Sequence, residues 1–218
     1  MASSTSPASP PTTAVLLDLD GTLVDSVYVH IVAWHEALRA AGHAVAMARI
    51  HAGIGMGSDR LVPWLVGGHL DDADAISADH TRRFLDRADG LLPTAGAREL
   101  VEDLEARKVP FIVSTSAGTE VREALLDVLG RTDLPITGAD DVGSSKPAPD
   151  LLTAALVELD VEADHVIMVG DAPWDALAAS RAGMDAVAVR CGGFGDGALR
   201  EAGASRIVDA PRDLIGTL

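Results

Sequence analysis

Residues 14–26 read AVLLDLDGTLVDS, and this stretch decides the fold. Its first four residues are apolar, which predicts a strand buried on both faces, and the strand ends at Asp18, Asp20 and a turn glycine. Because alternate side chains of a strand point the same way, the two carboxylates are expected to lie together where the strand leaves the sheet. A divalent cation such as Mg²⁺ would offset their repulsion. Taken alone, however, an Asp-x-Asp-Gly stretch is as typical of an ordinary acidic turn as of a metal site.

Downstream of this stretch, strand-like apolar segments alternate with helices. The predicted strands are 111–114, a short one near Ile136, 166–169 and 185–189, and the predicted helices are 97–108, 119–129, 149–159 and 175–182. Such alternation indicates parallel crossover units. We therefore expect an α/β fold built on a doubly wound, Rossmann-like parallel sheet.

The segment that follows the first strand has helical periodicity and no strand pattern. We predict helices over 27–41, 59–66 and 72–88, with Ser26 as the N-cap of the first. A glycine-rich loop at 53–58 lacks the preceding strand and the following Lys-Ser/Thr of a nucleotide phosphate loop, so we interpret it as part of a cap. The expected organisation is a disordered tail (1–13), a core (14–26 and 91–218) and an inserted all-helical cap (27–90).

Charge and composition restrict the classes of partner. The formal net charge of −16 argues against general affinity for nucleic acid or anionic membranes, so any phosphate has to be bound locally. No apolar stretch is long enough to cross a bilayer, and residues 1–13 lack the basic start and apolar centre of a secretory signal. The single cysteine, Cys191, excludes an internal disulfide and suits a reducing compartment, so we expect a cytoplasmic protein.

Polar side chains follow three further strand ends or turns. Thr115 and Ser116 come after the strand at 111–114, Lys146 lies in a Ser-Lys-Pro-Ala-Pro-Asp turn, and Asp171 and Asp175 follow the strand at 166–169. Ligands of open parallel sheets collect beyond the carboxyl ends of the strands. We therefore expect these groups to converge with Asp18 and Asp20. His30 and His35 lie five residues apart, which does not favour a histidine metal site on one helix face.

These motifs together resemble the haloacid dehalogenase-like hydrolase superfamily. The similarity rests on Asp-Leu-Asp-Gly-Thr at 18–22, Thr115, Lys146 and Gly-Asp at 170–171 with Asp175, and it covers roughly residues 14–210. The resemblance implies a Rossmann-like core, a helical cap inserted after the first strand, a Mg²⁺ cofactor and an aspartyl-phosphate intermediate.

The resemblance also implies roles for the four acidic residues. Asp18 is the expected nucleophile, and Asp20 is expected to protonate the leaving oxygen and later to take a proton from water. Asp18, Asp171 and the main-chain carbonyl of Asp20 would hold Mg²⁺, and Asp175 would support the site directly or through water. The carbonyl of Asp20 is assigned by resemblance alone. Asp175 is equally typical of a helix N-terminal acid.

The remaining expected contacts are to the substrate. Lys146 would neutralise charge on the phosphoryl oxygens, while Thr115 and Ser116 would bind those oxygens after the second core strand. A solvated loop lysine and an ordinary strand-end hydroxyl are the alternatives for Lys146 and Thr115. Arg60, in the cap, is the candidate for contacting an anionic substrate, with a plain surface arginine as its alternative. His51 and Trp64 are weaker candidates.

Within the superfamily, the residues favour a phosphatase. Dehalogenases typically lack the second aspartate of the pair, which is present here as Asp20, and phosphonate-cleaving relatives use a cap lysine, whereas residues 27–90 contain none. The expected substrate is a small phosphorylated metabolite such as phosphoglycolate or a sugar phosphate, acted on by a monomer or weak homodimer. A sugar-phosphate mutase using Arg49 and Arg60, and a non-catalytic phosphate-ligand-binding protein, remain as alternatives.

Overall fold

The computed structural model describes residues 14–138 and 145–218, and within them a six-stranded parallel sheet forms the centre of the fold. The strands are β1 (Ala14–Leu17), β2 (Phe111–Ser114), β3 (Ile136–Thr137), β4 (Val166–Gly170), β5 (Asp185–Val189) and β6 (Arg206–Val208). Their order is β3-β2-β1-β4-β5-β6, so Leu16 of β1 lies between Ile112 of β2 and Met168 of β4. The predicted tail, residues 1–13, lies outside the described residues.

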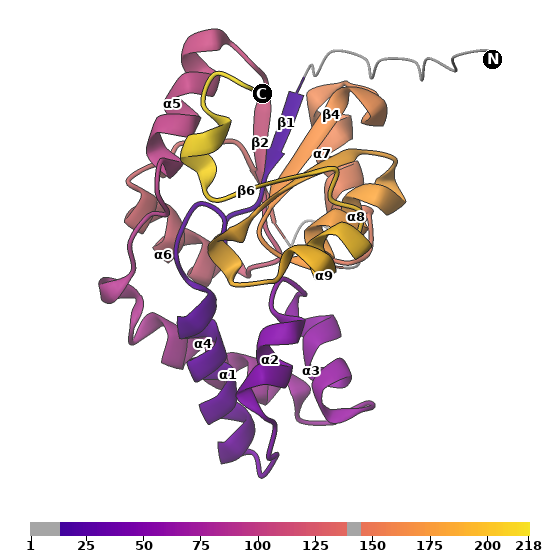
Figure 1. Ribbon diagram of the computed structural model, residues 1–218. Coiled ribbons are helices and arrows are strands. Elements are labelled where there is room, and N and C mark those ends of the chain that lie inside the picture. Colours follow the sequence, from indigo (N-terminus) through magenta and orange to yellow (C-terminus); the bar gives the residue numbers. More distant parts are fainter. Residues whose placement is uncertain (1–13, 139–144) are drawn as a thin grey trace, which may run out of the picture.

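Strand β1 is buried on both sides because its residues alternate between two hydrophobic clusters. Val15 and Leu17 pack in the cluster that also holds residues of α5 (Ala97–Arg107) and α6 (Thr119–Leu129). Leu16 packs on the opposite face. That face is covered by α7 (Asp150–Leu159), α8 (Pro173–Ala182) and α9 (Asp196–Glu201), and Figure 1 shows the two helical layers on either side of the strands. The doubly wound α/β prediction is confirmed.

Residues 27–90 contribute helices only and no strand of the sheet. They form α1 (Val27–Ala40), α2 (Met47–Gly53), α3 (Ser58–Val66), α4 (Ala73–Leu85) and the 3₁₀ turn η1 (Ala88–Gly90). In Figure 1 these helices gather beyond the end to which β1 points. They enclose a third hydrophobic cluster around Trp34 and Leu61. The division into core and cap, which we propose, rests on this separate cluster.

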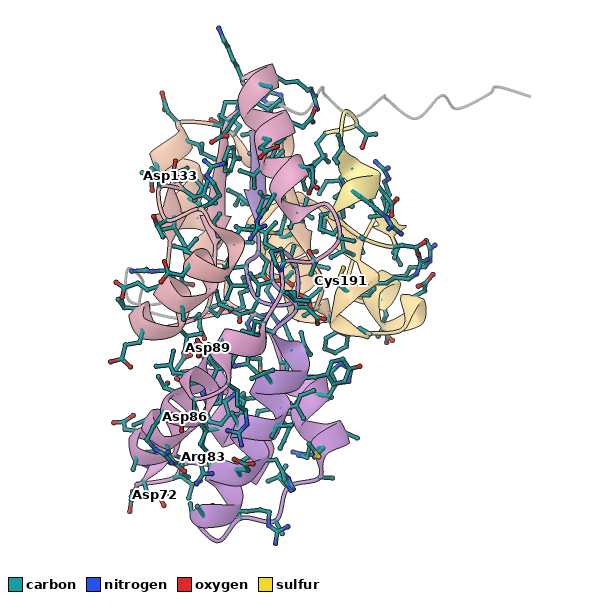
Figure 2. All side chains as sticks on the ribbon, turned by 90° about the vertical axis from the view of Figure 1, so that its left-hand side faces the viewer. Asp72, Arg83, Asp86, Asp89, Asp133 and Cys191 are labelled. Atoms are coloured by element: carbon teal, nitrogen blue, oxygen red, sulfur yellow. The ribbon has the colours of Figure 1, made fainter. Side chains whose placement is uncertain are left out.

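An ion-pair network joins α1 to α4. Arg83, labelled in Figure 2, lies 2.9 Å from Glu36 of α1 and 2.7 Å from Asp79 of its own helix. Arg87 adds a second contact to Glu36 at 2.9 Å. Because several charges share these contacts, the network orients α4 on α1 more firmly than one isolated surface pair would.

The chain crosses between the sheet and the helical segment at two adjacent points. Val24 and Pro93 form an antiparallel bridge. The N–H of Asp25 donates to the Leu92 carbonyl at 2.9 Å, and the N–H of Thr94 donates to the Leu23 carbonyl at 3.0 Å. The outgoing and returning segments therefore lie side by side.

Several element boundaries differ from the sequence predictions. The helix expected over 72–88 ends at Leu85 and is followed by the separate turn η1. Helices α2 and α9 and strand β6 were not predicted. No helix in the described part of the chain is long and apolar enough to span a bilayer.

Candidate active site

Asp18 lies directly after β1 and is held by a buried lysine. The N–H of Asp18 donates to the Val169 carbonyl at 2.9 Å, which continues the β1–β4 pairing by one residue. Lys146, with no exposed surface, places its Nζ 2.6 Å from Asp18 Oδ1 and 2.8 Å from Asp175 Oδ1, and donates to the Ser114 carbonyl at 2.9 Å. The solvated-lysine alternative is therefore wrong.

Burial and the charge of the partner residue have opposite effects on the pKa values of Asp18 and Lys146. Burial raises the pKa of Asp18 to about 7, although the nearby charge of Lys146 acts in the opposite direction. Burial alone would lower the pKa of Lys146, but the carboxylates of Asp175 and Asp18 outweigh it and keep that pKa above its usual value. Lys146 is therefore a permanent positive charge next to the carboxylate of Asp18.

Asp171 and Asp175 join Asp18 from the end of β4 and the first turn of α8. The hydroxyl of Thr22 donates to Asp171 Oδ1 at 3.0 Å and to Asp18 Oδ2 at 3.3 Å, which links the two loops. Asp175 Oδ2 accepts the N–H of Ala172 at 3.0 Å, so this carboxylate also holds the beginning of α8. Asp175 therefore acts as the helix N-terminal acid of the alternative prediction and also contacts the buried Lys146.

These three carboxylates fit a divalent cation. One oxygen from each of Asp18, Asp171 and Asp175 lies within 4.8 Å of the others. Asp171 Oδ2 is buried and accepts no hydrogen bond from any described residue, and burial together with the charges of Asp18 and Asp175 raises the pKa of Asp171 well above its usual range. A Cβ on Gly192 would lie 1.9 Å from that oxygen, so only glycine leaves room beside it. An oxygen-seeking cation such as Mg²⁺ suits this set.

Asp20 belongs to a second network, which includes a histidine that sequence reasoning missed. His30 Nε2 lies 2.7 Å from Asp20 Oδ1, and the Ser26 hydroxyl donates to the same oxygen at 3.0 Å. Burial would raise the pKa of Asp20, but the charge and hydrogen bond of His30 and the hydrogen bond of Ser26 outweigh it and lower that pKa. Ser26 is the N-cap residue of α1, as predicted, but its hydroxyl makes no cap hydrogen bond because it donates to Asp20.

A stack of rings extends this network into the helical segment. His30 Nδ1 lies 3.0 Å from His80 Nε2, and His80 stacks on Trp34 with ring centroids 3.9 Å apart. His30 itself stacks on Phe84 at 3.9 Å. Burial, and secondarily the charge of His30, holds the pKa of His80 well below its usual range, which keeps this imidazole neutral. Fifty residues separate the two histidines, so no local spacing could have indicated the pair.

A cavity of about 160 Å³ opens between the sheet edge and the helices. Asp18, Asp20, Thr115 and Ser116 line its sheet side. The Thr115 hydroxyl donates to Asp20 Oδ2 at 3.3 Å and accepts the Ala117 N–H at 3.0 Å, whereas the buried Ser116 Oγ has no hydrogen-bond partner among the described residues. The expected convergence of the strand-end groups is therefore present.

Arg60, the cap candidate for substrate contact, and Cys191 both lie outside the lining of this cavity. Arg60 is not among the lining residues; its half-exposed side chain lies on α3, 3.5 Å from Asp59. Cys191, labelled in Figure 2, contacts the Asp209 carbonyl at 3.6 Å, and burial, with the charge of Asp171 adding to it, raises the pKa of its thiol to about 11. A thiol whose pKa is raised is a poor nucleophile at neutral pH.

Further contacts join the helical segment to the sheet domain. His51 Nε2 lies 2.8 Å from the Gly192 carbonyl, and its ring stacks on Phe194 with centroids 4.4 Å apart. The indole N–H of Trp174 donates to the Ala52 carbonyl at 3.1 Å. Asp59 accepts a hydrogen bond from the Ser145 hydroxyl. His51 therefore joins the two parts of the molecule and does not line the cavity.

Comparison with known proteins places this geometry in a family. A family model described as haloacid dehalogenase-like hydrolase matches residues 12–183. The chain is 34% identical to a phosphoglycolate phosphatase from Rhodospirillum rubrum (82% of this chain, 80% of the relative) and 31% identical to a validoxylamine A 7'-phosphate phosphatase from Streptomyces hygroscopicus (78% and 81%).

Solved structures agree with these sequence matches. The crystal structure of a hydrolase from Pseudomonas syringae superimposes with a TM-score of 0.90 at 36% identity and covers 93% of this chain and 96% of that one. A putative beta-phosphoglucomutase from Bacteroides vulgatus, at 22% identity and a TM-score of 0.84 over 94% and 86% of the two chains, shares the fold. The chain belongs to the haloacid dehalogenase-like hydrolase family, in its phosphatase branch.

Proposed function

We propose that this enzyme is a Mg²⁺-dependent phosphatase that hydrolyses a small phosphorylated metabolite through an aspartyl-phosphate intermediate. The observation that carries the proposal is the position of Asp18. Its carboxylate lines the cavity, is oriented by Lys146 at 2.6 Å and belongs to the cluster with Asp171 and Asp175. A nucleophile, a fixed positive charge and a candidate metal site thus meet at one strand end.

Two steps complete the proposed reaction. An Asp18 oxygen attacks phosphorus, and the bond from phosphorus to the leaving oxygen breaks. Because the pKa of Asp20 is lowered in the free site, Asp20 has to take up a proton in the substrate complex, and it gives that proton to the leaving oxygen. Water then attacks the phosphorus of the acyl phosphate, Asp20 takes the proton of that water, and the bond to the Asp18 oxygen breaks. An alcohol and inorganic phosphate leave, and both aspartates return to their starting states.

The phosphoryl oxygens need donors and positive charge. Ser116 Oγ, buried at the cavity wall without a described partner, is available to donate to one of them, and Thr115 is within reach of the same region. Lys146 orients Asp18 and supplies positive charge beneath it. Donors that are in place before the substrate arrives stabilise developing charge without reorganisation.

Asp18 and Asp171 would hold Mg²⁺, with the main-chain carbonyl of Asp20 as the resemblance implies, and Asp175 would support them. Bound there, the cation would offset the charge of the carboxylates and of the phosphoryl oxygens. The unpartnered Asp171 Oδ2 supports this assignment. The role expected for Arg60 in contacting an anionic substrate, and a monomeric or weakly dimeric state, stay predictions.

Relatives suggest the substrate class. The names of two relatives specify phosphoglycolate and validoxylamine A 7'-phosphate, and a structure sharing the fold contains xylulose-(1,5)bisphosphate. We propose a substrate of this kind, either phosphoglycolate-like or a sugar phosphate. The mutase alternative is less favoured because Arg49, one of its two cap arginines, donates to the carbonyls of Trp64 and Leu65 at 2.7 and 3.1 Å.

The test is hydrolysis of a panel of phosphorylated metabolites with and without Mg²⁺, comparing the native chain with Asp18→Asn. Turnover that needs both the metal and Asp18 is expected. If no phosphate ester is hydrolysed while the ligands still bind, the result favours the alternative of a non-catalytic protein that binds phosphate ligands. If Asp18→Asn keeps normal turnover, the covalent mechanism is wrong.

A further inference from the structure

The side of the cavity opposite Asp18 and Asp20, where the proposed reaction places the leaving group, is lined mainly by uncharged side chains. Its walls are apolar side chains with a few hydroxyls between them. The apolar residues are Trp34, Ile54, Met56, Leu61 and Val121, and the hydroxyls belong to Ser58, Ser77 and Thr81. Only the opposite, sheet-side wall carries carboxylates, those of Asp18 and Asp20.

Neither a lysine nor an arginine is among the described residues that line this cavity. Residues 139–144, which lie outside the described part of the chain, include no lysine or arginine in the sequence. Lys146 is engaged by Asp18 and Asp175 behind the sheet-side wall, and the Arg49 guanidinium lies over the Trp64 ring at 4.8 Å while bonded to backbone carbonyls.

The two histidines in the wall do not supply a free positive charge either. His30 lies 2.7 Å from the carboxylate of Asp20, so any charge it carries is already opposed. His80 is buried between Trp34 and His30 and is neutral. The leaving-group side of the cavity therefore offers dispersion contacts and neutral hydrogen-bond partners.

An anionic group on the leaving side would lose its hydration and gain no opposite charge. Buried charges are tolerated when they are paired, and an unpaired one is strongly disfavoured. The formal net charge of −16 adds a repulsive field for every further negative charge on the ligand. A neutral alcohol, by contrast, can place its carbons against Trp34 and Leu61 and its hydroxyls toward Ser77 and Thr81.

We propose that the substrate is a phosphate monoester of a small, uncharged polyol, and that a carboxylate or a second phosphate on the leaving group is rejected. This inference rests on the proposed function and decides between its two substrate kinds.

The test uses two pairs of esters that differ only in CH₂OH against COO⁻. The pairs are 2-hydroxyethyl phosphate with 2-phosphoglycolate, and glycerol 3-phosphate with 3-phosphoglycerate. We expect kcat/KM to be at least tenfold higher for the neutral member of each pair, and the neutral member to bind Asp18→Asn more tightly by calorimetry. Equal or reversed preference would overturn the inference.

Failure of the proposed function gives a different result. In that case no ester, including p-nitrophenyl phosphate, is hydrolysed with Mg²⁺, while calorimetry with the two pairs still reports whether the cavity prefers neutral ligands. Arg60→Ala provides a further arm. Loss of 2-phosphoglycolate binding in this variant would show that Arg60 reaches the ligand and would contradict the inference.

A substitution on the leaving-group side of the cavity tests the inference in the opposite direction, because an added cation should improve turnover of the carboxylate esters. Thr81→Arg places a cation in the leaving-group side, and we expect it to raise the carboxylate-to-alcohol ratio of kcat/KM at least tenfold. Thr153→Arg, the same change at an exposed position of α7, is the matched control and should leave the ratio unchanged. If Thr81→Arg does not fold, Ser77→Lys serves the same purpose. An unchanged ratio in a folded wall variant would count against the inference.

Discussion

The carboxylate of Asp20, which we propose transfers a proton, is held in place by several neighbours. Its carboxylate accepts from Ser26 and Thr115 and lies against His30, so its position is fixed before any ligand binds. Asp20→Asn preserves the shape and most hydrogen bonds but cannot exchange the proton. We expect a folded protein whose kcat falls by about 10²- to 10⁴-fold, measured on the best substrate of the panel. Loss of the folded state would instead indicate a structural carboxylate.

We expect His80 to make the free energy of unfolding depend on pH. The folded state keeps this histidine neutral, whereas in the unfolded chain it takes up a proton below about pH 6.5. Below that pH the unfolded state binds more protons, so the free energy of unfolding falls as pH falls, by up to about 1.4 kcal/mol per pH unit.

Denaturant unfolding of the native chain and of His80→Gln between pH 7 and pH 5 checks this prediction. The variant should show a shallower loss, because glutamine does not titrate. His69→Gln, a change at an exposed histidine, is the matched control and should follow the native chain. Parallel pH profiles for the native chain and His80→Gln would show that the imidazole does not carry the effect.

Among single residues, the sequence predicted the position of those candidate site residues that belong to a short motif next to a strand. Asp18, Asp171 and Thr115 each come directly after the last residue of a strand, so their position at the sheet edge follows from that strand. His30 and His80 were missed for a physical reason. Their pairing depends on how α1 packs against α4, which no periodicity within either helix records.

Among the elements, the loop between α2 and α3 depends on a close approach that only glycine permits. Gly55 has φ of +102°, and a Cβ there would lie 2.8 Å from the Cβ of Ala172 at the start of α8. Gly55→Ala should push this loop away from the sheet edge. Because small misplacements near a site are costly, we expect kcat/KM to fall roughly 10- to 100-fold with the fold retained.

Gly68→Ala is the control for this prediction, measured in the same assay. Gly68 also lies in the helical segment, but a Cβ there meets nothing within 4 Å. We expect its kcat/KM to match that of the native chain. If both variants lost activity equally, the loss would reflect a general weakening of the helical segment instead of the contact with Ala172.

Element prediction succeeded where a buried apolar run is short and sharply bounded. Strands at 111–114 and 185–189 match because flanking polar and glycine residues end them. The helix predicted to 88 was too long because the buried positions Phe84 and Ala88 keep helical spacing across the break at Leu85. Strand β6 was missed because its three residues are only partly buried or exposed.

For the whole molecule, we expect the cluster of buried carboxylates to make the free energy of unfolding depend on Mg²⁺. Asp18, Asp171 and Asp175 repel one another, so a cation that binds only the folded state stabilises it by mass action. We expect the free energy of unfolding to rise by about 2.7 kcal/mol when free Mg²⁺ is 100 times its dissociation constant, and a chelator to remove the gain. Thermal unfolding with added Mg²⁺ or chelator measures it.

The variant Asp171→Asn should separate two contributions to the free energy of unfolding. One is the repulsion among the buried carboxylates, and the other is the stabilisation by bound Mg²⁺. Because burial and like charges raise the pKa of Asp171, its ionised form destabilises the metal-free fold at neutral pH. The variant should therefore be more stable than the native chain without Mg²⁺ and should lose most of the Mg²⁺ response. Asp185→Asn, at an exposed aspartate, should respond as the native chain does.

The adjacent chain crossings at Val24 and Pro93 bear on how such proteins diversify. When the two ends of an inserted segment already lie side by side, each further residue adds little to the entropic cost of closing the loop. The paired segments at Val24 and Pro93 can therefore carry inserts of very different length. Replacing residues 27–90 with another folded segment of similar end separation would leave β1 and α5 joined as before. The insert supplies most of the leaving-group wall and the sheet supplies the carboxylates, so descendants can acquire a new substrate range while inheriting the same reaction chemistry.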